Sequence, residues 1–254
     1  MVNVINQFLV IVLFLFPAAI CSMLLVGWKR VREFSKLEPK KEEKQSKKIR
    51  RDFYALLSEI KSDCKKKNKI RVKILPVNLM NPKNDLGFSG TPFCLRTIAY
   101  TPVAIKHYAI NPPIWKIAIV QSIGHEIAHW WDIRRNKFHK EQPEENQHFF
   151  YWVHEVRCDF YGVNFAMSFD ENYSREEIIT AVEEKSEVYK QNSDYKPGHR
   201  KFHPSWEFRL DMLKNYTSFD EEVIKAIKQI AGCNDDTYVE LITRNLGEIA
   251  TTNH

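Results

Sequence analysis

A chain of 254 residues with 44% hydrophobic residues is long enough for one globular domain and an appendage. Its net charge of +6 comes from one segment, because residues 29–51 hold eleven Lys or Arg against four Glu and the remainder is close to neutral. A nucleic-acid-binding domain would carry basic charge on its folded part, so we expect no nucleic-acid partner. Five cysteines, an odd number without ligand-like spacing, argue against a disulfide framework and indicate a reducing compartment.

The N-terminus carries an uncharged, largely apolar run at residues 8–28 that has the length of a membrane-spanning helix. Pro17 interrupts the run, which a membrane helix tolerates better than a soluble one. A cleaved signal peptide would begin with a basic region, and residues 1–7 contain no Lys or Arg. Basic residues follow the run at once, so the positive-inside rule predicts a single-pass membrane protein whose long C-terminal part faces the cytoplasm.

The sequence therefore divides into three parts. In chain order they are an anchor at residues 1–28, a basic juxtamembrane linker at residues 29–50 and a folded domain at residues 51–254. The linker is a lysine-rich, solvated stalk that could also attract anionic lipid headgroups.

Short elements open the folded domain. Residues 52–66 have the apolar spacing of a helix, residues 70–75 alternate as in a strand, and residues 76–92 are rich in Asn, Pro and Gly, as in a loop. Residues 98–105 favour a strand, but Pro102 lacks a backbone donor, so we expect this strand at the edge of a sheet. An exposed edge next to the following helix would be a platform on which an extended peptide could add as a strand.

Residues 113–136 are predicted to form the central helix of the domain, since proline suits a first helical turn and the apolar residues are dense. The helix contains an H-E-x-x-H motif, in which His125 and His129 lie four residues apart and share one face. Both imidazoles could bind one cation, and Glu126 could polarise a metal-activated water. These polar residues would be costly in so apolar a helix without partners, and a zinc ion would satisfy them together.

The third ligand is expected from a second apolar helix at residues 144–169. A metzincin arrangement would place a glycine and a ligand shortly after the second histidine, but Asp132 and Arg135 occupy those positions, which excludes it. Glu155 on the second helix could complete a His-His-Glu site with the fourth position left for water.

Other residues of the second helix bear on the same site. Asp159 shares a face with Glu155 and could accept the outer N–H of a ligand histidine, which would fix its tautomer and orientation. His148 and His154 compete for the metal. His154 points about 100° around the helix from Glu155, so both cannot readily face one ion. We favour Glu155 and keep His154 as the alternative ligand.

The motifs and their order resemble those of the gluzincin zinc peptidases. The resemblance covers about residues 51–213, and its last motif is similar to an element of HtpX-like and CAAX prenyl protease type I peptidases. The E-x-x-C-D form of the second motif also resembles the BlaR/MecR sensor peptidases. The three motifs are H-E-x-x-H at residues 125–129, E-x-x-x-D at residues 155–159 and H-P-x-x-x-x-R at residues 203–209.

The resemblance implies a role for each matching residue. The implied roles are zinc ligand for His125, His129 and Glu155, general base for Glu126, outer carboxylate for Asp159, oxyanion stabiliser for His203, and site organiser or substrate binder for Arg209.

We therefore expect an α+β fold: a mainly helical, zincin-like peptidase domain with a small sheet, an edge strand by the active-site helix, and one N-terminal transmembrane helix. The expected function is that of a membrane-anchored zinc metalloendopeptidase that binds one Zn²⁺ and hydrolyses protein or peptide substrates by a metal-activated water. The alternative is a sensor or regulatory module of the BlaR/MecR or ImmA type that acts on one dedicated partner. A zinc-stabilised scaffold without catalysis would have no need of Glu126.

The remaining segments indicate packing elements around the site. Residues 174–177 and 218–221 both have the pattern of a capping box at a helix start. Residues 235–250 are expected to be helical, and residues 176–190 are expected to form a solvated face. Without the family resemblance, His203 and the proline after it indicate only a helix start.

Overall fold

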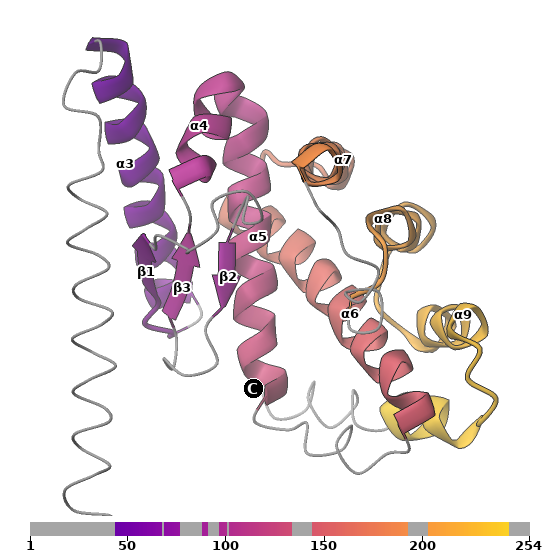
Figure 1. Ribbon diagram of the computed structural model, residues 1–254. Coiled ribbons are helices and arrows are strands. Elements are labelled where there is room, and N and C mark those ends of the chain that lie inside the picture. Colours follow the sequence, from indigo (N-terminus) through magenta and orange to yellow (C-terminus); the bar gives the residue numbers. More distant parts are fainter. Residues whose placement is uncertain are drawn as a thin grey trace, which may run out of the picture.

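The computed structural model describes residues 44–67, 69–76, 88–90, 97–100, 102–133, 144–192 and 203–243. This part of the chain is mainly helical and contains one small sheet, as the sequence predicts (Figure 1). The membrane span predicted at residues 8–28 lies outside the described residues. Within those residues, no helix is both long enough and apolar enough to cross a membrane.

Helices form most of the described chain. In order they are α3 (Lys44–Lys67), α4 (Pro102–Ile110), α5 (Pro112–Ile133), α6 (Glu144–Phe169), α7 (Arg175–Asn192), α8 (Trp206–Asn215) and α9 (Glu221–Ala231), followed by a short helix at residues 237–243. Helix α6 begins and ends where the sequence predicts, and α5 begins one residue earlier. Helix α3 begins at Lys44, eight residues before the helix predicted at residues 52–66, and so includes the last residues of the basic linker.

The sheet has three strands in the order β1-β3-β2, namely β1 (Lys73–Pro76), β2 (Phe88–Gly90) and β3 (Thr97–Tyr100). Strand β3 is central, because it pairs in parallel with β1 and antiparallel with β2. The prediction of an edge strand at residues 98–105 is therefore wrong. Pro102 does not interrupt a strand but begins α4, where its missing N–H costs no hydrogen bond.

The edge strand on the side of α5 is β2, which lies within the segment predicted as loop. Figure 1 shows the sheet between α3 and α5, with β2 nearest to α5. A strand of three residues is too short to leave a clear alternating pattern in the sequence, so local reasoning could not detect it. The expected arrangement of a sheet edge beside the motif helix is nevertheless present, with a different strand in that place.

The core lies on both sides of α5. On the sheet side, Phe53 of α3 packs against Tyr100 of β3 with ring centroids 5.4 Å apart. Ile119, Ile123 and Ile127 of α5 are at most 1% exposed. On the other side α6 crosses α5, and α7, α8 and α9 each contact α6 (Figure 1). Helix α5 is thus buried from several directions, which explains its dense apolar sequence.

Two glycines allow α5 and α6 to approach closely. A Cβ atom at Gly162 of α6 would lie 2.6 Å from the carbonyl oxygen of Gln121 and 3.2 Å from the backbone nitrogen of His125. A Cβ atom at Gly124 of α5 would lie 2.7 Å from Cβ of Phe165. Only glycine fits such contacts, so this pair sets how near the motif residues of the two helices come to one another.

The caps of the C-terminal helices follow the sequence in part. The capping box before α7 is confirmed, since Ser174 and Glu177 exchange hydrogen bonds between backbone N–H groups and side-chain oxygens. The predicted box at residues 218–221 is wrong. Asp220 is the N-cap of α9, and the hydroxyl of Ser218 donates to its carboxylate instead. A carboxylate next to the helix is as good a cap as serine.

Candidate metal centre

The two histidines of the H-E-x-x-H motif lie side by side on α5. Their Nε2 atoms are 3.0 Å apart and their ring centroids 4.7 Å apart. His125 is buried, and the His129 side chain is 20% exposed. The arrangement follows from the four-residue spacing, which places the two side chains one turn apart on the same face.

Glu155 reaches the histidines from α6. Its Oε2 atom lies 3.7 Å from Nε2 of His125, and its Oε1 atom lies 3.6 Å from Nε2 of His129. One donor atom from each of the three residues falls within 4.8 Å of the others, so they could hold a single ion. The structure thus brings together the three residues that the sequence selects.

Asp159 stands behind His125, one turn after Glu155 on α6. Its Oδ1 atom is 2.9 Å from Nδ1 of His125, at hydrogen-bond distance but away from the ideal angle. This carboxylate favours the tautomer with the proton on Nδ1 and leaves the Nε2 lone pair directed at the site. The contact is the one that the sequence predicts for Asp159.

The donor atoms fit a divalent cation. If Nδ1 of His129 carries its proton, the lone pairs of two imidazole Nε2 atoms face each other at 3.0 Å beside the carboxylate of Glu155. Three acceptors with no proton between them repel one another, and a cation removes that repulsion. Two imidazoles and one carboxylate are also the ligand set of zinc sites that keep a position open for water.

Arg209 of α8 links the two carboxylates of α6. Its Nε and Nη2 atoms each donate to Asp159 at 2.6 Å, and its Nη1 atom lies 3.5 Å from Glu155. The guanidinium is held in place by Trp206, whose ring centroid lies 4.2 Å from Cζ. Ser205 caps α8 by accepting from the N–H of Phe208, so the helix begins later than the sequence predicts.

The same contacts control the charges of the buried acids. Burial alone would raise the pKa of Glu155, but the hydrogen bond from His203, the ligand histidines and Arg209 lower it well below its usual range. Burial opposes ionisation of Asp159 too, and Arg209 and His125 together hold its pKa below the usual range. Both carboxylates are therefore ionised, which is the form that a cation and a histidine N–H require.

The pKa values of His129 and His203 are shifted in opposite directions. Burial lowers the pKa of His129 to about 3, so its imidazole is neutral and can act as a ligand. Nδ1 of His203 lies 3.2 Å from Oε1 of Glu155, and this hydrogen bond raises the pKa of His203. The side chain of His203 is 46% exposed, so it stands at the open side of the centre.

Glu126 is half-buried on α5, between the two histidines in sequence. Its negative charge favours the protonated forms of both Lys185 and His203. The other six residues that the motifs select gather around one point between α5, α6 and the start of α8, and they are the three ligands, Asp159, His203 and Arg209.

The two competing histidines of α6 have other contacts. His148 donates from Nε2 to the carbonyl oxygen of Ala231 at the end of α9, at 2.6 Å. His154 and Glu155 do not face one ion, in agreement with the prediction, because Nε2 of His154 lies 2.7 Å from Nδ1 of His129 whereas Glu155 lies near its Nε2 atom. His154 meets the outer edge of that ring rather than the side facing Glu155. Sγ of Cys158 also approaches His129 Nδ1, at 3.6 Å.

Sequence reasoning missed Lys185 of α7, which it assigned to a solvated face. The residue is only 7% exposed, and its Nζ atom donates to Gln121 Oε1 and Ser122 Oγ of α5, both at 2.9 Å. Burial lowers its pKa to about 8. A signal was present in the sequence, because Ile178 and Val182 precede it at helical spacing and are both buried.

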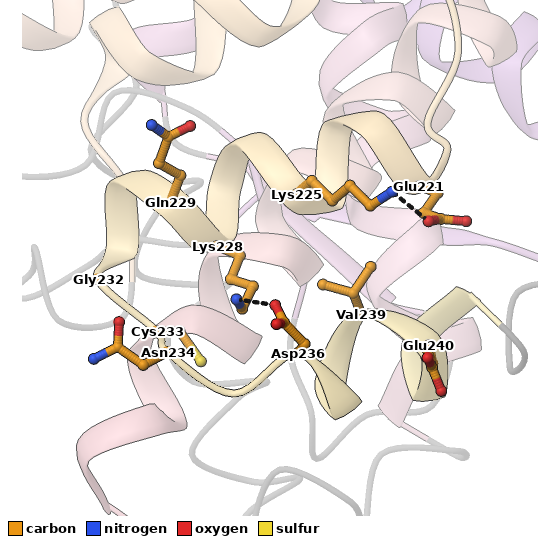
Figure 2. Close-up of a pocket in the computed structure, with 10 residues that line it drawn as sticks. All are labelled: Glu221, Lys225, Lys228, Gln229, Gly232, Cys233, Asn234, Asp236, Val239 and Glu240. Carbon is orange, nitrogen blue, oxygen red and sulfur yellow. Dashed lines mark hydrogen bonds and ion pairs between the residues drawn. The ribbon is translucent and has the colours of Figure 1, made fainter.

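A separate hollow of about 550 Å³ lies between α9 and the segment that follows it. Figure 2 shows two ion pairs at its wall, from Lys225 to Glu221 and from Lys228 to Asp236, each at 2.6 Å. None of its lining residues belongs to the metal centre.

Comparison of the chain with protein-family models, with curated proteins and with solved structures gives no match.

Proposed function

We propose that this chain is a zinc-dependent metalloendopeptidase whose single Zn²⁺ is held by His125, His129 and Glu155. The observation that supports this most strongly is the convergence of these three donors at one partly open point, with Glu126 next to His125 in the same helix. A purely structural zinc site has no use for a neighbouring general base and closes its fourth position with a protein ligand.

A zinc ion bound there would supply Lewis acidity, which lowers the pKa of water and polarises a scissile carbonyl. Glu126 accepts the proton of the attacking water and passes it to the leaving amine. His203, at the open side, donates a hydrogen bond to the developing oxyanion. Asp159 keeps His125 in the required tautomer, and Arg209 keeps that carboxylate ionised.

The substrate class follows from the sheet edge. Strand β2 lies beside α5 and pairs with β3 on only one side within the described sheet. An extended peptide can add to such an edge through main-chain hydrogen bonds, which accept many sequences. We propose a protein or peptide substrate, cleaved on the cytoplasmic side of the membrane to which residues 8–28 would tether the domain, with no nucleic-acid partner.

The deciding experiment compares wild type with Glu126→Gln in cleavage of an unfolded protein substrate. Loss of the general base should reduce the rate by about 10²–10⁴-fold, while one bound zinc per chain is retained. Glu176→Gln, an exposed glutamate at the start of α7, is the matched control and should cleave at the wild-type rate. Equal rates for Glu126→Gln and wild type would overturn the proposal.

A further inference from the structure

His129 presents its two ring nitrogens to two different sets of donors. Nε2 faces His125 and Glu155, whereas Nδ1 faces Nε2 of His154 at 2.7 Å and Sγ of Cys158 at 3.6 Å. The donor atoms of His129, His154 and Cys158 lie within 4.8 Å of one another, as do those of the first set. We propose that these three residues form a second seat for a soft transition-metal ion, back to back with the first.

The chemistry of the second seat differs from that of the first. Each seat has two imidazole nitrogens, but the second adds a thiolate, which is a soft donor, whereas the first adds a carboxylate, which is a hard one. Thiophilic ions such as Cd²⁺ and Cu⁺ therefore prefer the second seat. Zn²⁺ and Co²⁺ prefer the first, where a carboxylate oxygen completes a His-His-Glu set and leaves a position for water.

The two seats exclude each other because they share one imidazole. The contact with Asp159 keeps the His125 proton on Nδ1, so Nε2 of His125 is an acceptor. With its proton on Nδ1, His129 donates to His154 and offers Nε2 to the first seat. With its proton on Nε2, it donates to His125 and offers Nδ1 to the second seat. A neutral imidazole can serve one ion at a time.

Because the two seats exclude each other, an ion in the second seat affects the first. An ion bound to His129 Nδ1, His154 and Cys158 removes His129 from the first seat without entering it. A soft metal ion would thus inhibit any activity of the first seat by withdrawing a ligand. The existence of the second seat does not depend on the proposed peptidase function, since it rests on donor atoms alone.

The test uses Co²⁺ and the full-length chain freed of metal. In wild type the first equivalent should bind without a sulfur-to-cobalt charge-transfer band, because the first seat holds no sulfur. Glu155→Gln weakens the first seat, so the same equivalent should move to the second seat and the band should appear. The band should be lost in Glu155→Gln/Cys158→Ser. It should persist in Glu155→Gln/Cys233→Ser, which removes another buried cysteine and is the matched control.

A second measurement does not require an altered first seat. Titration of wild type with Cd²⁺ should give one equivalent of cadmium–thiolate absorption, which should disappear in Cys158→Ser or in His154→Ala and remain in Cys233→Ser. Absence of the sulfur band in both Glu155→Gln with Co²⁺ and wild type with Cd²⁺ would overturn the proposal. Two ions bound at once would overturn the exclusion. Neither result depends on peptide cleavage, so failure of the second seat can be distinguished from failure of the proposed peptidase function.

Discussion

Replacement of Lys185 by Met should change how the stability of the protein depends on alkaline pH. Burial lowers the pKa of this ammonium from its ordinary value of 10.5 to about 8, against the opposing attraction of Asp159. Each tenfold change in an ionisation constant corresponds to about 1.4 kcal/mol, so the buried charge costs about 3 kcal/mol below pH 8. Between pH 8 and 10.5 the unfolded chain holds the proton more tightly than the folded chain, so stability rises with pH.

The variant has no ammonium to titrate, so the free energy of unfolding of wild type relative to Lys185→Met should rise by about 2 kcal/mol from pH 7 to pH 9.5. Urea unfolding at both pH values measures this difference, and the other alkaline groups cancel because both proteins carry them. Lys214→Met, which removes a half-exposed lysine of α8, is the control and should show no such rise. Parallel pH dependence of wild type and Lys185→Met would refute the reasoning.

Three further predictions concern the α5–α6 contact, the buried Asp159–Arg209 pair and the cap of α7. Gly162→Ala should cost about 1–3 kcal/mol in urea unfolding and weaken zinc binding in chelator competition, because its Cβ would lie 2.6 Å from a carbonyl of α5. Asp159→Asn should cost about 3–5 kcal/mol near neutral pH by removing the carboxylate that accepts two hydrogen bonds from buried Arg209. Because the pKa of Asp159 is held low in the folded protein, wild type loses this stability as the pH falls and the carboxylate is protonated. The difference in unfolding free energy between wild type and Asp159→Asn should therefore shrink in acid. An unchanged difference in acid would contradict the prediction. Ser174→Ala should cost about 1 kcal/mol in thermal or urea unfolding through loss of the α7 cap, with no effect on zinc affinity.

The parts of the site that local spacing determines could be predicted from the sequence. A four-residue interval on a helix is enough to place His125 beside His129, and the same interval places Asp159 one turn from Glu155. The bounds of α6 were predictable because its apolar residues begin and end clearly. The gathering of these residues at one point also agrees with the sequence, although their chemical roles are proposals.

The sheet could be predicted only in outline. Proline is tolerated both at the edge of a sheet and in the first turn of a helix, so Pro102 alone could not distinguish a long edge strand from the start of α4. Which strand is central depends on pairing between residues distant in sequence. Ile98 pairs with Ile74 on one side and with Gly90 on the other, and no local pattern encodes that choice.

The rotation of each helix about its own axis was the second feature that could not be predicted from the sequence. Periodicity shows that His154 and Glu155 point in different directions, but not which of them meets which edge of His129. The close contact at Gly162 fixes the crossing of α5 and α6, and the crossing brings both residues to that one ring. For the same reason the charge of Lys185 suggested that its side chain faces solvent, whereas the packing of α7 against α5 buries this side chain.

The most direct test of the proposed centre is X-ray absorption spectroscopy at the zinc edge on the full-length chain loaded with one equivalent of Zn²⁺. The arrangement of His125, His129 and Glu155 predicts a spectrum with two imidazoles, oxygen neighbours and no sulfur. Loss of one imidazole signal in His125→Ala would assign it. A sulfur neighbour in wild type would place zinc with Cys158 instead, and failure to bind zinc would contradict the centre altogether.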